Sequence, residues 1–382
     1  MKKLLEGVGV EWKALGDVGE VRMCKRILKE QTLPEGEIPF YKIGTFGKNP
    51  DAYISRELFE EFKSKYNYPR IGTVLISASG TIGRTVIFDG KDAYFQDSNI
   101  VWIDNDESYV LNKYLFYFYQ LANWGISEGG TIQRLYNDNL RKLQIPIPPL
   151  TIQAEIVRIL DNFTELTEEL TEELTEELTA RKKQYNYYRD QLLTFEDGEV
   201  EWKTLGKLAE NLDSLRKPIT SSLRDFGEIP YYGASGIVDY VKDYIFDGDF
   251  LLVSEDGANL IARSTPIAFS ISGKSWVNNH AHVLKFNTYA ERRFVEFYLN
   301  SIDLTPYISG AAQPKLNQKN LNSISIPNPA PAEKIRIVAI LDKFDALTNS
   351  ITEGLPREIA LRQQQYEYYR DLLLSFPKKE VV

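Results

Sequence analysis

The chain has 382 residues, of which 43% are hydrophobic and 26% are charged. This length exceeds what one hydrophobic core usually serves, so we expect at least two domains. No uncharged apolar run approaches the ~20 residues that cross a bilayer, and the first residues lack the apolar core of a signal peptide, which argues against a membrane or secreted protein. The single cysteine, Cys24, cannot form an internal disulfide and suits a cytoplasmic location.

The formal net charge of -9 at first argues against a nucleic-acid partner, because phosphate contacts need Lys and Arg. The distribution of charge weakens that objection. Residues 145–198 carry 12 acidic and 5 basic side chains, so seven of the nine excess negative charges lie in this short segment. The longer segments on either side are nearly neutral and can each present a basic face.

Secondary structure is expected to be mixed, with strands and helices in two blocks, residues 1–144 and 199–325. Runs rich in β-branched and aromatic residues, separated by Gly, Asp and Asn, predict strands at 73–77, 85–88, 100–103, 249–254, 266–272 and 282–286. Amphipathic patterns predict helices at 54–66, 112–123 and 291–302. This composition favours an α+β class.

The sequence repeats itself. VEWKALG at 10–16 returns as VEWKTLG at 200–206, and IPIPPLTIQAEIVRILDNF at 145–163 returns as IPNPAPAEKIRIVAILDKF at 326–344. RKKQYNYYRDQLLTF at 181–195 returns as RQQQYEYYRDLLLSF at 362–376. Between these matching ends the blocks differ, and SGTIGRT at 79–85 has only a loose counterpart. The order is therefore block, connector, block, connector, with a repeated scaffold and a variable interior.

The connectors, residues 145–198 and 326–382, are predicted to be long helices whose apolar stripes pack on each other. The same spacing of three and four residues occurs in both. The residues expected at the contact are Ile156, Ile159, Phe163, Leu166, Leu170, Leu174, Leu178, Ile337, Ile340, Phe344, Leu347 and Ile351.

Two features distinguish the connectors. TELTEELTEELTEEL at 164–178 repeats every four residues, so each leucine drifts by ~40° around the helix from the one before. It is either a solvated acidic face or a spacer that can change length in whole units, and these interpretations are compatible. In the second connector, Gly354 and Pro356 predict a kink or break.

No catalytic motif is visible. Pro50, Asp51 and Glu61-Phe62-Lys63 have the spacing of a metal-dependent nuclease, but the Glu and Lys fall in a helical pattern rather than on a strand. His280 and His282 are interpreted as ordinary strand histidines, because no third metal ligand is evident. The Gly-rich segment 79–85 lacks the end of a phosphate-binding loop. We therefore expect neither a metal nor a cofactor in this chain.

Loops that combine glycine with hydrogen-bonding side chains suit a protein that contacts base edges in a DNA groove. For each residue taken alone, an ordinary surface or turn role is the alternative. The candidates for DNA contact are Lys42, Thr45, Thr81, Arg84, Gln133, Arg134, Tyr231, Tyr232, Ser235, Asn259, Arg263, Gln313, Lys315 and Asn317.

Over its whole length the chain resembles a specificity subunit of a Type I restriction-modification system. The doubled IPxP…ILDxF and QYxYYRD segments, the EWKALG and EWKTLG block starts and the TEEL tract carry this resemblance. It implies an α+β fold with two target recognition domains, joined by two long antiparallel helices in a pseudo-twofold tandem repeat. The interruption at Gly354 and Pro356 departs from an uninterrupted second helix.

The resemblance also implies a non-catalytic subunit that binds a bipartite, asymmetric double-stranded DNA target, with one half-site per domain. Two methyltransferase subunits, which hold S-adenosylmethionine, and optionally restriction or translocase subunits would assemble on it. Two other hypotheses remain open: a two-lobed protein-protein adaptor without DNA, favoured by the net charge, and a nuclease with Asp51, Glu61 and Lys63 in its site.

Overall fold

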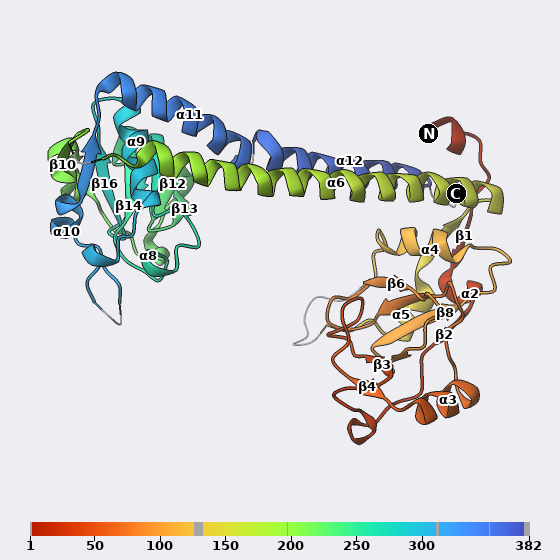
Figure 1. The fold of residues 1–382 in the computed structure, drawn as a ribbon. Helices are drawn as coiled ribbons and strands as arrows, with labels where there is room; N and C mark the ends of the chain where they lie inside the picture. The colour runs from red at the N-terminus through yellow and green to blue at the C-terminus, as the bar shows by residue number, and fades with distance from the viewer. Residues whose placement is uncertain (1, 126–132, 197, 311–312, 351, 378–382) are drawn as a thin grey trace. The chain divides into compact units, whose positions relative to one another are not determined.

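The structure, a computed structural model, describes residues 2–125, 133–196, 198–310, 313–350 and 352–377 (Figure 1). It divides into two compact units, residues 1–172 with 360–382 and residues 173–359. Each unit contains one mixed domain of strands and helices together with parts of the long helices. Within the described ranges, none of the helices combines the length and the apolar character needed to span a bilayer.

The domain of the first unit begins and ends on one antiparallel strand pair, in which Trp12 lies opposite Pro146. Its elements are α1 (Lys2–Leu5), β1 (Glu11–Ala14), α2 (Leu15–Val18), β2 (Glu20–Arg22), β3 (Ile38–Tyr41), β4 (Tyr53–Ile54), α3 (Arg56–Lys65), β5 (Val74–Ser77), β6 (Thr85–Ile87), β7 (Tyr94–Phe95), β8 (Ile100–Asp104), α4 (Asn112–Tyr119), α5 (Asn137–Lys142) and β9 (Gln144–Ile147). The strands form a four-stranded sheet in the order β2-β8-β5-β6 and a three-stranded sheet in the order β4-β3-β7.

The domain of the second unit is also closed by a strand pair, in which Trp202 lies opposite Pro327. Its elements are β10 (Glu201–Thr204), α7 (Leu205–Leu208), β11 (Glu210–Asn211), β12 (Phe226–Gly233), β13 (Gly236–Val241), β14 (Phe246–Ser254), α8 (Asn259–Ala262), β15 (Ala268–Val277), β16 (Ala281–Lys285), α9 (Tyr289–Ser301), α10 (Gln318–Ser323) and β17 (Ser325–Asn328). Six of the strands form one sheet in the order β11-β16-β14-β15-β12-β13.

The two sheet arrangements have equivalent connections. In each domain the central strand, β5 or β14, pairs antiparallel with β8 or β16. Each domain also has a parallel pair, β3 with β7 and β12 with β15. The long strand β15 replaces the separate β6 and β7, and it joins into one sheet what is divided in the first domain. The interiors therefore share one fold, although their sequences show only a loose correspondence.

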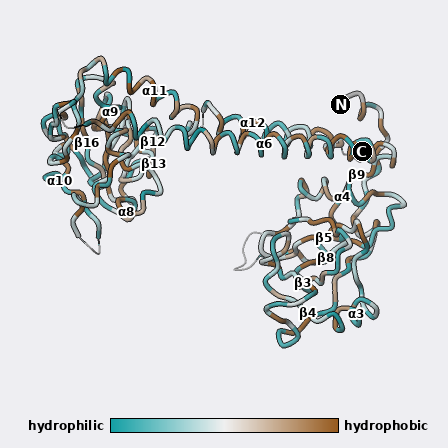
Figure 2. The backbone as a smooth tube through the Cα atoms, in the orientation of Figure 1, coloured by the Kyte–Doolittle hydropathy of each residue, from teal (hydrophilic) through white to brown (hydrophobic). Residues whose placement is uncertain are grey.

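The central strands are buried on both faces, which explains their continuous apolar runs. In β5, Leu75 packs into one hydrophobic cluster, whereas Val74 and Ile76 pack into the other with α4. In β14, Leu252 likewise faces one cluster and Leu251 the other. Figure 2 shows hydrophobic stretches running through the interior of each domain. Each domain thus has a core on both sides of its main sheet.

The long helices are α6 (Leu150–Leu193), α11 (Pro331–Asn349) and α12 (Gly354–Leu374). In the first unit, the start of α6 and the end of α12 enter the core of the domain through Ile156 and Leu373. Further along the same pair, the rings of Phe163 and Tyr369 stack with centroids 5.2 Å apart. These contacts join the first domain to an antiparallel helix pair.

The second unit repeats this arrangement with α11 and the end of α6. Ile337 of α11 and Leu193 of α6 enter the core of the second domain. The rings of Tyr188 and Phe344 stack with centroids 5.7 Å apart, as Tyr369 and Phe163 do in the first unit. The predicted packing of the two long helical segments is thus present separately in each unit.

The predicted stripe residues differ in exposure. Ile156 and Ile337 are buried, Leu166 is 49% exposed, and Ile351 lies outside the described residues. The half-buried ones are Ile159, Phe163, Leu170, Leu174, Leu178, Ile340, Phe344 and Leu347. The predicted interruption is confirmed, because α11 ends at Asn349 and α12 begins at Gly354, whose φ of 76° favours glycine.

Candidate nucleic-acid interface

In the first domain, the Gly-rich loop after β5 is fixed to two other segments. The backbone N–H of Ala78 donates to the carbonyl of Asn99 at 2.7 Å, and Leu135 N–H donates to the carbonyl of Ala78 at 2.8 Å. The next residue, Ser79, forms a β-bridge with Arg134 and donates its hydroxyl to Asn99 Oδ1 at 2.9 Å. Side chains from three distant segments therefore meet at this loop.

In the second domain, the loop after β14 has the same backbone frame. Glu255 N–H donates to the carbonyl of His280 at 2.8 Å, and Leu316 N–H donates to the carbonyl of Glu255 at 2.8 Å. Asp256 forms a β-bridge with Lys315, and its carboxylate oxygens lie 2.9 Å from His280 Nδ1. The same three-segment junction thus carries different side chains.

A hollow of about 560 Å³ adjoins the loop cluster of the first domain. Its cationic lining residues are Arg26, Lys29, Lys42 and Arg134. Asp97, which accepts a hydrogen bond from Arg26 at 3.0 Å, is the acidic residue among the described lining residues. Asp97 pairs with Arg26, and Asp51, outside the lining, pairs with Lys42, so Lys29 and Arg134 leave the hollow with an excess of positive charge, which suits a phosphate-bearing ligand.

The polar floor of this hollow is the segment Gln96–Asn99. Ser98 has a φ of 59°, a left-handed conformation that a serine seldom adopts. Arg134 donates to the carbonyl of Ser98 at 2.8 Å, and Gln96 Oε1 accepts from the backbone of Ile43 at 2.9 Å. Contacts from neighbouring loops therefore hold this segment in its unusual backbone conformation.

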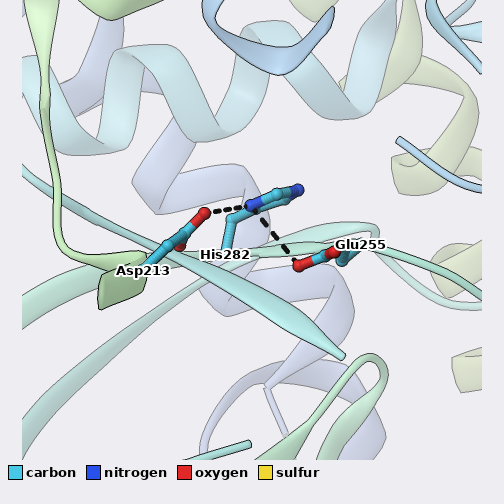
Figure 3. Close-up of side chains that lie close together, drawn as sticks. All are labelled: Asp213, Glu255 and His282. Carbon is cyan, nitrogen blue, oxygen red and sulfur yellow. Dashed lines mark hydrogen bonds and ion pairs between the residues drawn. The ribbon is translucent and has the colours of Figure 1, made fainter. Parts of the chain in front are cut away.

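The loop of the second domain rests on a buried ionic network (Figure 3). His282 is fully buried, and its Nδ1 lies 2.6 Å from Asp213 and 3.8 Å from Glu255. Its Nε2 lies 2.6 Å from the carbonyl oxygen of Leu316, which can only accept. Glu255 also pairs with Arg216 at 2.6 Å and with Lys315 at 3.0 Å.

Because His282 faces acceptors at both ring nitrogens, this geometry suits an imidazolium ion that donates on both sides. Burial alone opposes the ionisation of Asp213, but its hydrogen bond with His282 and the nearby cations outweigh burial and lower its pKa. Burial likewise opposes ionisation of Glu255, whose pKa is lowered by Arg216 and Lys315. Asp213, Glu255 and His282 have metal-ligand spacing. Their charges are nevertheless balanced by one another and by the two basic residues.

The structure places the first-domain candidates around the loop cluster. Lys42 pairs with Asp51 at 2.9 Å, and the Thr45 hydroxyl bonds the Lys42 backbone. Arg84 donates to the carbonyl of Phe46 at 3.0 Å and to the Thr81 hydroxyl at 3.3 Å. Lys42 and Arg134 line the hollow, whereas Thr81 and Gln133 are exposed residues that do not line it.

The second-domain candidates are more scattered. Tyr231 is buried, Tyr232 is half-buried, and Ser235 and Gln313 are exposed. Asn317 caps the start of α10 by accepting from the backbone of Asn320. Lys315 joins the loop after β14, as described above. These positions include both surface groups and groups already occupied in local structure.

Arg263 and Asn259 have structural contacts. Arg263, with a φ of 50°, donates to the carbonyls of Asn300 at 3.2 Å and Ile302 at 2.7 Å, at the carboxyl end of α9. Asn259 holds the same loop through its hydrogen bonds with Ser264 and Thr265. These contacts favour the ordinary structural role, which the sequence left as the alternative, over base contact by these two candidates.

Several polar residues of the two loop clusters are not among the candidates named from the sequence. In the first domain they are Arg26, Lys29, Thr32, Gln96 and Asn99, and in the second they are Asp256 and His280. Asn99 directly precedes the predicted strand at 100–103, and His280 lies two residues before the predicted strand at 282–286; this place next to a strand is the sequence signal that could have identified them. The interpretation of His280 as a strand histidine is wrong, because β16 begins at Ala281 and leaves His280, which is exposed, in the preceding turn, whereas His282 lies on the strand.

The residues of the nuclease-like string pair with lysines. Asp51 contacts Lys42, and Glu61 contacts Lys65 one helical turn away at 2.9 Å. Glu61 and Lys63 both lie on α3, as their amphipathic pattern indicates. This arrangement lacks the strand that would hold such a pair beside a metal.

Comparison with known proteins identifies the family. The model of the Type I restriction modification DNA specificity domain matches residues 8–180 and 198–361. The EcoR124I/EcoR124II specificity subunit of Escherichia coli is 35% identical over 414 residues, which cover 100% of this chain and 98% of that protein. The chain therefore belongs to the specificity subunits of Type I restriction-modification systems, the non-catalytic subunits that bind target DNA in these complexes.

Other relatives agree with this assignment. A putative type I restriction enzyme specificity subunit of Haemophilus influenzae is 69% identical over 181 residues, but the match spans only 47% of each chain. The fold is similar to the S subunit from M. genitalium, with a TM-score of 0.50, 16% identity and 98% of each chain covered. A chain from a study of type I complex assembly and conformational transition has a TM-score of 0.62 at 16% identity, over 96% of this chain and 97% of that one.

Proposed function

We propose that this subunit binds a bipartite, asymmetric double-stranded DNA target and that each domain contacts one half-site. Residues 1–144 form the first target recognition domain and residues 199–325 the second. Residues 145–198 form a central helical spacer between them, and residues 326–382 form a C-terminal helical spacer. The DNA partner also makes the cytoplasm the expected site of action.

The observation that carries the proposal is the shared loop frame with different side chains. The loops after β5 and β14 have matching backbone hydrogen bonds, yet Ser79, Asn99 and Arg134 in one domain correspond to Asp256, His280 and Lys315 in the other. Two domains with the same backbone frame but different polar side chains suit the recognition of two different half-site sequences. The positive hollow beside Arg134 supplies phosphate-binding groups in the first domain.

We further propose that two methyltransferase subunits, which hold S-adenosylmethionine, bind the repeated helical surfaces. Tyr187 on α6 and Tyr368 on α12 are 59% and 63% exposed. Arg189 and Arg370 pair with the next residue in the same way, at 2.7 and 2.8 Å from the aspartate. A surface that occurs twice suits two copies of one partner. Restriction or translocase subunits would join the assembly through these partners.

A domain exchange tests the DNA half of the proposal. Residues 11–144 are replaced by the equivalent block of another specificity subunit, and the methylated motif is determined in cells that also express the methyltransferase partner. We expect one half-site to change while the other half-site is retained. A reciprocal exchange of residues 201–325 is the matched control and should change the other half. If an active complex shows a change in both half-sites, or in neither, independent recognition by the two domains is contradicted.

The methyltransferase half has a separate test. The purified chain should neither bind S-adenosylmethionine nor methylate DNA, whereas the chain mixed with its partner should do both. Alanine at Tyr187 and Tyr368 together should weaken partner binding, measured by sedimentation of the complex. Alanine at the exposed Tyr136 is the matched control. Unchanged assembly of the double variant would contradict the proposed surface.

A further inference from the structure

We propose that Asn99 in the first domain and His280 in the second are equivalent specificity-determining residues, each of which contacts a base edge in the major groove of its half-site. This inference rests on the proposed DNA recognition. Beyond that proposal, it identifies one base-contact position in each domain and the type of base group that this position selects.

The equivalence of Asn99 and His280 follows from the backbone and not from sequence similarity. Their carbonyl groups accept from Ala78 N–H and Glu255 N–H, the first residues after β5 and β14, at 2.7 and 2.8 Å. One further pair of backbone hydrogen bonds also matches between the two domains. Gln96 N–H donates to Tyr41 O and Asn278 N–H to Tyr232 O, each at 3.0 Å.

In both domains the residue that faces this position comes from the loop after the central strand. Ser79 contacts Asn99, and Asp256 contacts His280, each at 2.9 Å. The third member of each group, Arg134 or Lys315, forms a β-bridge to that same loop residue. Each group therefore combines a hydrogen-bonding side chain, its orienting neighbour and a cation.

Asn99 lines the positively charged hollow, where a DNA backbone would be attracted. Its Oδ1 accepts the Ser79 hydroxyl, which fixes the orientation of the amide. One lone pair of this oxygen remains available, and among the described residues none accepts a hydrogen bond from the Nδ2 group. An amide with one donor and one acceptor available matches the N7 and N6 edge of adenine.

His280 presents a different chemistry at the equivalent position. Its side chain is 52% exposed, and both carboxylate oxygens of Asp256 lie 2.9 Å from Nδ1. A carboxylate at Nδ1 holds the ring proton there, so Nε2 of the singly protonated ring is an acceptor. Such an acceptor selects a base that offers an amino group in the major groove, which is adenine N6 or cytosine N4.

The test uses the full chain assembled with its methyltransferase partner and reads the methylated motif of each variant. Asn99→Ala should relax one position of the first half-site, and His280→Ala should relax one position of the second. Loss of one bidentate or anchored base contact reduces discrimination at that position roughly 5- to 150-fold. Asp256→Ala should relax the same position as His280→Ala, because it frees the orientation of the imidazole.

Matched controls are Asn67→Ala and Asp243→Ala, exposed residues of the same domains outside the loop clusters. They should leave both half-sites unchanged. Asn99→Asp and His280→Gln preserve approximate size and cover the case in which an alanine variant fails to fold. If the folded variants retain the wild-type motif, these residues only support the loops and the inference is overturned. If the wild-type complex shows no bipartite motif, the proposed function itself fails and the inference fails with it.

Discussion

The Nζ atom of Lys113 on α4 lies 2.7 Å from a carboxylate oxygen of Asp161 on α6. The second unit contains the matching contact, because Arg293 on α9 lies 2.8 Å from Asp342 on α11. In both units a tyrosine hydroxyl donates to the same aspartate, from Tyr117 at 2.6 Å in the first and from Tyr289 at 2.8 Å in the second. Each domain is thus fastened to its long helix by a repeated polar contact next to the apolar core.

The ion pairs Lys113–Asp161 and Arg293–Asp342 should contribute differently to stability. The Lys113 side chain is 50% exposed, whereas that of Arg293 is only 12% exposed and also contacts Glu296 and Asp345. Asp161→Asn should therefore reduce the free energy of unfolding by at most about 1 kcal/mol. Asp342→Asn should cost about 1–3 kcal/mol, because a more buried cation loses a partner. Denaturant unfolding of both variants measures this, and equal costs would contradict the role of burial.

The repeated ends of the blocks could be predicted from the sequence because their side chains repeat. Ile156 and Ile337 enter equivalent cores, as their shared spacing indicates. The equivalence of the interiors could not be predicted in this way. It is carried by backbone hydrogen bonds such as those of Ala78 and Glu255, which place few constraints on the side chain.

The loop clusters were predicted only in part for a related reason. Lys42 and Arg134 are 92 residues apart in the sequence, and only the folded sheet places both beside Asn99. The buried ionic network of Asp213, Glu255 and His282 could not be predicted for the same reason, since Asp213 lies 69 residues before His282. A sequence pattern that examines local spacing finds His280 and His282 but neither of their carboxylate partners.

Substitution of Arg263 should affect stability more than recognition. Its guanidinium donates to the carbonyls of Asn300 and Ile302 at the end of α9, where the last carbonyls of a helix have no intrahelical donor. Arg263→Ala should reduce the free energy of unfolding by about 1–3 kcal/mol and leave the methylated motif unchanged. Arg263→Lys should restore part of the stability. A relaxed base position in a fully stable Arg263→Ala variant would instead support Arg263 as a base-contact residue.

The ionic network should make the second domain sensitive to acid. The pKa of Asp213 is lowered from 3.8 and that of Glu255 from 4.5, so the unfolded chain binds more protons than the native one below these values. Their contribution to stability is therefore complete above about pH 5 and is lost as the pH falls toward the lowered values. We expect the wild type to lose stability over this acid range.

Asp213→Asn tests the origin of this sensitivity. Near neutral pH the variant should be destabilised by about 3 kcal/mol, because His282 and Arg216 lose a buried partner. The difference from the wild type should shrink as the pH falls from about 5 to about 3, measured by thermal or denaturant unfolding. Asp243→Asn, at an exposed position, is the control. A difference that is independent of pH would show that the Asp213 carboxylate does not supply the effect.

The TEEL tract at 164–178, within α6, should act as a ruler between the half-sites. One inserted TEEL unit adds four residues, or ~6 Å of helix, and keeps leucine near the stripe. Duplex DNA rises ~3.4 Å per base pair, so the gap between half-sites can lengthen by at most about two base pairs. Because the partner helices are unchanged and must adjust, the realised shift should be about one or two base pairs.

The half-site sequences themselves should stay the same in these variants, because the insertion changes no residue of the loop clusters. The measurement is the methylated motif of variants with one unit removed and one unit added, each expressed with the methyltransferase partner. A control variant replaces Glu172 and Glu173 with glutamine, which reduces the acidic charge of the tract without changing its length. If active length variants keep the same gap between the half-sites, the tract is only a solvated helix face and does not set the spacing. A changed gap in the charge variant would show that charge rather than length sets the spacing.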